Sequence, residues 1–214
     1  MIGYPLMRCI VLVSVGLALF AAGCATTQNS SFFALQALSS STQPVWSTPG
    51  QRPLAIGVGP VILADYLNRP QIITRTGPNE LAFAEYDRWA GPLPDNFKRV
   101  LAENLAILLN TDRVSVYPWE SSAQVEYQIK LDVQQFDGAL GGRAELVAWW
   151  SVHGKDADQL LLNRKSRLTA TAADSTYQSL VVAENQLLAD LSREIANAVK
   201  TLAETRPASR TTGQ

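Results

Sequence analysis

The sequence predicts an α+β fold in which a single, mainly antiparallel β-sheet is covered by two α-helices. Residues 123–134 alternate strictly between apolar and polar side chains, which is the pattern of a strand with one buried face. Two longer segments, at about 95–109 and 176–203, instead repeat apolar residues at helical spacing. The order of these segments, strands then helix and strands then helix, is typical of a sheet covered by helices.

The first strands are short and are separated by turn residues. FFALQAL at 32–38 is expected to form a strand, and the Ser-, Thr-, Gln-, Pro- and Gly-rich stretch at 39–53 a loop. Residues 54–63 predict a strand that is interrupted at Gly59-Pro60, because proline cannot donate to a central ladder. A hairpin follows, with a strand at 72–74, a turn at 77–79 and a partner strand at 81–85.

The first helix is expected from Asp95 to Leu109, with one apolar stripe along it. Asp95 is the expected cap of the exposed amides at its start, and residues 110–112 are expected to end it. A brief strand at 114–118 follows.

Three strands, at 123–134, 143–153 and 159–172, then predict an antiparallel meander. In the last helix, Ser175 and Gln178 have the spacing of a capping box. We expect its polar residues, Glu184 among them, to lie off the buried stripe.

The N-terminus has the pattern of a lipoprotein signal peptide. An apolar stretch at 9–20 follows Arg8, and it is too short to span a membrane but fits the core of a secretory signal. Small residues at 21–23 precede Cys24, as in a bacterial lipobox, where the cysteine thiol is acylated and becomes the mature N-terminus. An ordinary secretory signal and a single transmembrane anchor are the alternatives. Ala25 after the cysteine favours an outer-membrane address with the domain facing the periplasm.

These patterns divide the chain into four parts. They are a signal peptide at 1–23, a lipidated tether at 24–31, one domain at 32–203 and a disordered tail at 204–214.

Composition excludes several classes of protein. The formal charge of −1, from 18 basic and 19 acidic residues, argues against nucleic-acid binding, which requires a basic surplus. Apart from Cys9 in the signal, Cys24 is the only cysteine, so no disulfide or thiolate metal cluster is expected in the domain. The one histidine, His153, lies at a strand end and is expected to be solvent-exposed. No cofactor, metal site or catalytic residue is predicted.

Two groups of residues are candidates for binding a partner, because Arg, Tyr and Trp often anchor interfaces. Trp149 is expected on the outward face of its strand, beside Val147. The second group combines a turn with a pair of residues about twenty positions later: Tyr66, Leu67, Arg69 and Pro70, with Arg88 and Trp89. A packed turn, and a tryptophan covered by a loop, are the alternative interpretations.

The same residues carry a family resemblance. DYLNRPQIITR at 65–75, RWAGPL at 88–93, LAENL at 101–105, LDVQQFDG at 131–138 and LVAWWSV at 146–152 resemble, in this order, the paraquat-inducible protein C (PqiC/YmbA) family. The members of this family are ABC-type transport auxiliary lipoproteins, and the similarity covers residues 32–203.

The resemblance implies a non-enzymatic outer-membrane lipoprotein that works with an MCE-domain protein and an inner-membrane transporter component to move phospholipids between membranes and protect envelope integrity. It also allows for a homo-oligomer. The alternative is an envelope lipoprotein that scaffolds or activates cell-wall or outer-membrane assembly machinery without handling lipid.

Overall fold

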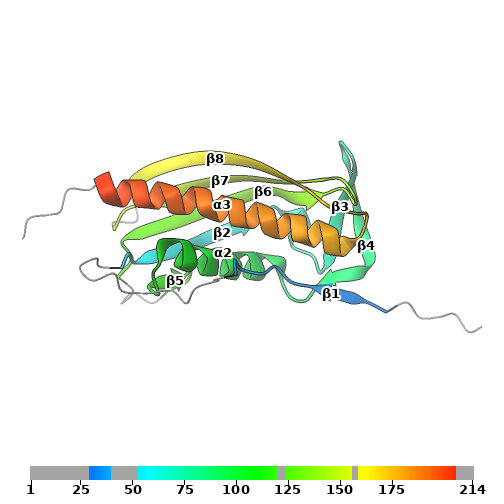
Figure 1. The fold of residues 1–214 in the computed structure, drawn as a ribbon, viewed down its shortest axis with the longest axis horizontal. Helices are drawn as coiled ribbons and strands as arrows, with labels where there is room; N and C mark the ends of the chain where they lie inside the picture. Colours follow the sequence, from blue (N-terminus) through cyan, green and yellow to red (C-terminus); the bar gives the residue numbers. More distant parts are fainter. Residues whose placement is uncertain (1–28, 40–52, 120–123, 156–158, 206–214) are drawn as a thin grey trace, which may run out of the picture. The chain divides into compact units, whose positions relative to one another are not determined.

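The computed structural model describes residues 29–39, 53–119, 124–155 and 159–205 (Figure 1). The predicted signal peptide, Cys24, most of the tether and loop, and all but the first two residues of the predicted tail therefore lie outside the described residues. The elements are β1 (Ser31–Phe33), β2 (Ile56–Leu63), the 3-10 helix η1 (Asp65–Leu67), β3 (Gln71–Gly77), β4 (Glu80–Trp89), α2 (Leu93–Leu109), β5 (Val114–Val116), β6 (Tyr127–Gly138), β7 (Arg143–His153), β8 (Leu160–Thr171) and α3 (Tyr177–Thr205).

The described strands form one eight-stranded sheet, so the predicted fold class is confirmed. Its order is β1-β4-β3-β6-β2-β5, and β7 and β8 continue from β6. The two longest pairings, β6 with β7 and β7 with β8, are antiparallel and form the predicted meander. Four pairings are parallel, β1–β4, β2–β5, β2–β6 and β3–β6, which the sequence pattern did not predict. Parallel neighbours need a long crossover, and α2 lies within the one that joins β2 to β6.

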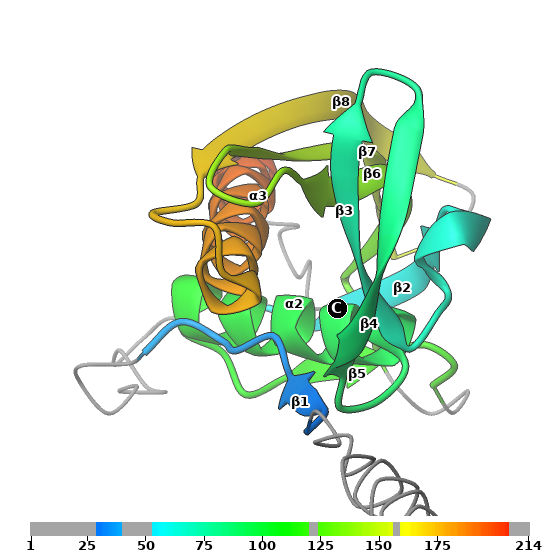
Figure 2. The ribbon, with the colours of Figure 1, turned by 90° about the vertical axis from the view of Figure 1, so that its right-hand side faces the viewer.

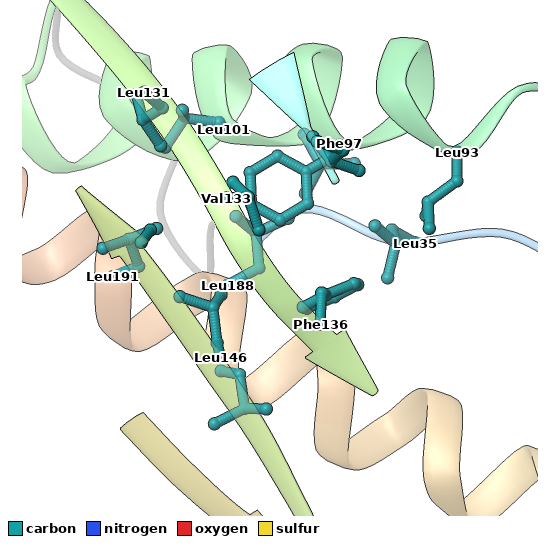
Figure 3. Close-up of a cluster of buried hydrophobic side chains, with 14 of the residues drawn as sticks. Leu35, Leu93, Phe97, Leu101, Leu131, Val133, Phe136, Leu146, Leu188 and Leu191 are labelled. Atoms are coloured by element: carbon teal, nitrogen blue, oxygen red, sulfur yellow. The ribbon is translucent and has the colours of Figure 1, made fainter. Parts of the chain in front are cut away.

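Both helices cover the same side of the sheet (Figure 2). α2 packs on β2 and β5, α3 packs on β6, β7 and β8, and the two helices contact each other. The hydrophobic core fills the space between the sheet and the two helices. Figure 3 shows leucines of both helices pointing toward leucines of β6 and β7. At its centre, the rings of Phe97 and Phe136 meet edge to face with their centroids 5.2 Å apart.

The first predicted strand is shorter than expected, since β1 ends at Phe33. The following backbone is held by side chains of the helices instead of by a neighbouring strand. The amides of Leu35 and Leu38 donate to Asn96 Oδ1 and Asn104 Oδ1 of α2, at 2.6 and 2.8 Å, and the amide of Gln36 donates to Asn185 Oδ1 of α3. The asparagines supply the acceptors that a strand neighbour would otherwise provide.

Both predicted helix caps were wrong. α2 begins at Leu93, so Asp95 lies inside its first turn and pairs with Lys98 at 3.2 Å. In α3 the cap is Thr176, whose Oγ1 accepts a hydrogen bond from the Ser179 amide at 3.2 Å. Asn110, with φ of 50°, ends α2 as expected. α3 continues to Thr205, two residues beyond the predicted end of the domain.

Glu184 departs from its expected position on the polar side of α3, because its side chain is buried with 1% exposure. Burial raises the pKa of Glu184 well above its ordinary value of 4.5, and the charge of Asp137 adds to this effect. Its Oε2 atom has no hydrogen-bond partner among the described residues. α3 therefore carries a buried carboxyl group that folding favours in the neutral form.

Candidate functional site

The candidate site lies on the side of the sheet turned away from α2 and α3, which we call the outer face. Along β7, the side chains of Leu146, Ala148 and Trp150 point toward the helices and are buried. The intervening residues point outward, and Trp149 is 43% exposed there, as the alternation predicted. Val147 shares the outer face but is only 4% exposed, because its register places it between the longer side chains of Gln135 and Arg167.

A row of four side chains crosses the outer face at Trp149. The pairing register aligns Ile62 of β2 with Asp132 of β6, Asp132 with Trp149 of β7, and Trp149 with Lys165 of β8. Ile62 is 60% exposed, and the ammonium of Lys165 lies 5.3 Å from the centre of the Trp149 ring. Large exposed apolar side chains beside charged ones are the composition of a protein-binding surface.

At the end of β6, a buried carboxylate holds the turn that contains the second candidate group. Asp137 is fully buried and accepts hydrogen bonds from Tyr66 Oη at 2.6 Å and from Arg75 Nε and Nη2 at 2.8 and 3.0 Å. Gln135 Nε2 donates to it at 3.1 Å. We call these four residues the Asp137 cluster. It ties η1, β3 and β6 together, so the turn after η1 has a fixed position over the outer face.

The cluster raises the pKa values of Tyr66 and Arg75. Burial, and then the hydrogen bond to Asp137, raise the pKa of Tyr66 well above its ordinary value. The hydrogen bond from Arg75 to Asp137 raises the pKa of Arg75. The phenol stays protonated and donates to the carboxylate, so Tyr66 acts as a structural anchor of the turn.

A second exposed patch forms where the turn meets the β3–β4 hairpin. The guanidinium of Arg69 lies 4.9 Å from the centre of the Phe83 ring, and Phe83 is 49% exposed. Phe83 pairs with Ile73 in the register, so the two side chains lie on the same face of the hairpin. Ile73 is two positions before Arg75 on β3 and shares its face, and the Arg75 side chain reaches Asp137 on the outer face. Phe83 and Arg69 therefore share the outer face with Trp149.

The structure separates the candidate residues by exposure. Arg69, Pro70 and Trp149 are exposed, and Tyr66 and Arg88 are half-buried. Leu67 and Trp89 are core residues with 2% and 6% exposure, and Trp89 pairs with Phe33 of β1 in the sheet. Of the candidate residues, Arg69, Pro70 and Trp149 therefore remain accessible to a partner. Phe83 and Ile62 join them on the outer face.

Phe83, Ile62 and the members of the Asp137 cluster other than Tyr66 were not predicted as site residues from the sequence. Phe83 and Ile62 look like ordinary strand residues, and only the register shows that they lie outward beside Arg69 and Trp149. Asp137 follows Phe136 in a strand, and no spacing in the sequence relates it to Tyr66, which is 71 residues away.

No group of three or more His, Cys, Asp or Glu side chains in the described part of the chain could hold a metal ion. His153 is half-buried instead of solvent-exposed, and its Nε2 lies 3.0 Å from Ser151 Oγ, two positions earlier on the strand. Within the described ranges, no helix is both long and apolar enough to cross a membrane.

Residues 36–196 match the family model of the ABC-type transport auxiliary lipoprotein component. The chain belongs to this family. The match covers the sheet from β2 onward, both helices as far as Ala196 and the whole Asp137 cluster.

Two curated relatives and two solved structures are similar to this family member. The intermembrane transport lipoproteins PqiC of Escherichia coli K12 and of Shigella flexneri are each 25% identical over 186 residues, covering 86% of this chain and 95% of the relative. A crystal structure from Xanthomonas campestris has a TM-score of 0.66 at 16% identity, covering 82% of this chain and 97% of its own. Another crystal structure has a TM-score of 0.65 at 20% identity, covering 80% and 99%. These two structures share the fold.

Proposed function

We propose that this chain is a non-enzymatic lipoprotein subunit of an intermembrane phospholipid transport system. Acylated Cys24 anchors it in the outer membrane, its domain faces the periplasm, and it supports envelope integrity. The observation that carries this proposal is the match to the intermembrane transport lipoproteins PqiC along 95% of their length. Several acyl chains on one cysteine give stable membrane attachment, where a single chain does not.

The proposed partner is an MCE-domain protein, which links this subunit to an inner-membrane transporter component. The outer face supplies the docking surface, through Ile62 and Trp149 in one patch and Arg69, Pro70 and Phe83 in the other. Exposed aromatic and arginine side chains of this kind contribute most of the binding energy in many interfaces. The Asp137 cluster holds the second patch in position before the partner arrives, which lowers the entropy cost of binding.

Affinity purification of the lipidated, tagged chain from cell envelopes tests the proposal. We expect an MCE-domain protein and phospholipid in the eluate, and we expect the double variant Ile62→Ser, Trp149→Ser to lose the partner. Val182→Ser is the matched control, since Val182 is 56% exposed on α3, away from the outer face. Recovery of cell-wall synthases or assembly factors without an MCE-domain protein would support the scaffolding alternative. Equal recovery of the MCE-domain protein by the double variant would place the docking surface elsewhere.

A further inference from the structure

A groove of about 650 Å³ runs between β8 and the C-terminal half of α3. From β8 it is lined by Leu162 and by the basic residues Arg164, Lys165 and Arg167, and from α3 by Ala198 and Leu202. This groove lies along the free edge of β8, which pairs with β7 alone among the described strands. It adjoins the first patch of the proposed docking surface at Lys165, whose ammonium lies 5.3 Å from the centre of the Trp149 ring.

The groove carries a surplus of positive charge. Its one carboxylate is Glu194, which accepts a hydrogen bond from Ser166, and Ser166 in turn accepts one from Trp150 Nε1 at 2.8 Å. Arg167 forms an ion pair with Glu145. Among the described residues, Arg164 has no ion-pair partner and Lys165 contacts only the Trp149 ring. Two cations beside the groove therefore remain available to an anion.

The other lining side chains are apolar at Leu162, Ala198 and Leu202 and polar at Asn197 and Thr201. Leu162 of β8 and Leu202 of α3 are half-buried, and Ala198 of α3 adds a small apolar side chain to the lining. An inorganic anion would satisfy the cations but would leave most of a 650 Å³ groove, and both leucines, without contacts. Cations next to leucine side chains match an amphiphile with an anionic headgroup, and the neighbouring Asn197 and Thr201 can hydrogen-bond its polar groups.

We propose that this groove binds an acidic phospholipid. The headgroup phosphate contacts Arg164 and Lys165, and the glycerol and first methylene groups pack against Leu162 and Leu202. This proposal rests on the proposed lipid transport function for the identity of the amphiphile. Phosphate at Lys165 competes with the Trp149 ring for the ammonium, so binding also changes the environment of that tryptophan.

Isothermal titration of the purified mature protein, with serine in place of Cys24, tests the groove directly. The probe is dihexanoyl-phosphatidylglycerol below its micelle concentration, with dihexanoyl-phosphatidylcholine and inorganic phosphate as comparisons. We expect phosphatidylglycerol to bind most tightly, with a change in tryptophan fluorescence. The double variant Arg164→Glu, Lys165→Glu is expected to weaken it at least ~10-fold, since each cation near an anionic lipid contributes roughly 1 kcal/mol.

Lys200→Glu is the control for net charge, since Lys200 is exposed on α3 and does not line the groove. Retained affinity in this variant, with an unchanged circular dichroism spectrum of the double variant, supports the groove. Equal loss in both variants would reduce the effect to overall charge, and displacement of the lipid by equimolar phosphate would make this an anion site only. Equal affinity for both lipids would also overturn the proposal. Partner capture does not enter this assay, so its failure is distinguishable from a failure of the proposed function.

Discussion

The carboxylate of Asp137 joins β6 to η1 and β3, whose bonded residues lie 71 and 62 positions earlier in the chain. Its hydrogen bonds come from Tyr66 of η1, Arg75 of β3 and Gln135 of β6, and the aspartate itself is fully buried. A buried charge is tolerated only when its partners satisfy it, and here three side chains do so. The position of the turn after η1, which contains Arg69, therefore depends on the buried Asp137.

Asp137→Asn is expected to lower the free energy of unfolding by ~3–5 kcal/mol, the range for breaking a buried ion pair, because it leaves Arg75 opposite a neutral amide. Urea unfolding followed by circular dichroism measures the change. Asp132→Asn, on an exposed outer-face position of the same strand, is the control and should stay within about 0.5 kcal/mol of the native chain. Equal stabilities of the two variants would show that the Asp137 cluster contributes no more than a surface pair.

Glu184 predicts a pH dependence of stability. Its pKa is raised in the folded chain, so folding favours the protonated form, and the stabilisation is fully present below about pH 4.5, the unfolded value. It is lost as pH rises from there through the folded pKa. Glu184→Gln lacks this loss, so its advantage in melting temperature over the native chain should grow as pH rises above 4.5 and then level off.

The measurement is a series of thermal melts of both proteins between pH 4 and 9. Glu103→Gln, at an exposed position on α2, is the control and should run parallel to the native chain apart from a small constant offset. A melting-temperature difference that does not change with pH would contradict the inference that the buried Glu184 titrates with an elevated pKa.

At the scale of elements, the segment after β1 is fastened to the helices by asparagine side chains. Asn104 is buried on α2, accepts from the Leu38 amide and donates from Nδ2 to Ser192 Oγ of α3 at 3.1 Å. The Ser192 hydroxyl in turn donates a hydrogen bond to the Leu188 carbonyl at 2.6 Å. One amide side chain thus links the N-terminal segment to both helices, which a strand neighbour could not do.

Asn104→Ala should destabilise the chain by about 1–3 kcal/mol for each buried group that is left without a partner. It should also raise the hydrogen-exchange rate of the Leu38 amide, which loses its acceptor. Asn197→Ala, at an exposed position on α3, is the matched control. Unchanged exchange at Leu38 in Asn104→Ala would mean that the segment is held by its apolar contacts alone.

At the scale of the whole molecule, the proposed membrane attachment depends on Cys24. Cys24→Ala should move the protein from the membrane to the soluble fraction and abolish incorporation of labelled fatty acid. Cys9→Ala is the control, since Cys9 lies within the predicted signal peptide and should leave attachment unchanged. If Cys24→Ala stayed in the membrane fraction, the uncleaved transmembrane anchor considered as an alternative would be the better interpretation.

The sequence by itself determined the fold class, the meander and the alternation of inward and outward side chains on β7, because alternation and helical spacing are local properties of the chain. It also carried the family resemblance that the comparisons confirmed. Only the tertiary structure decided the parallel pairings, the burial of Glu184, Leu67 and Trp89, and the meeting of Tyr66 with Asp137. These depend on contacts between residues up to 71 positions apart, or on which side of an element its neighbours cover. No local pattern encodes either one.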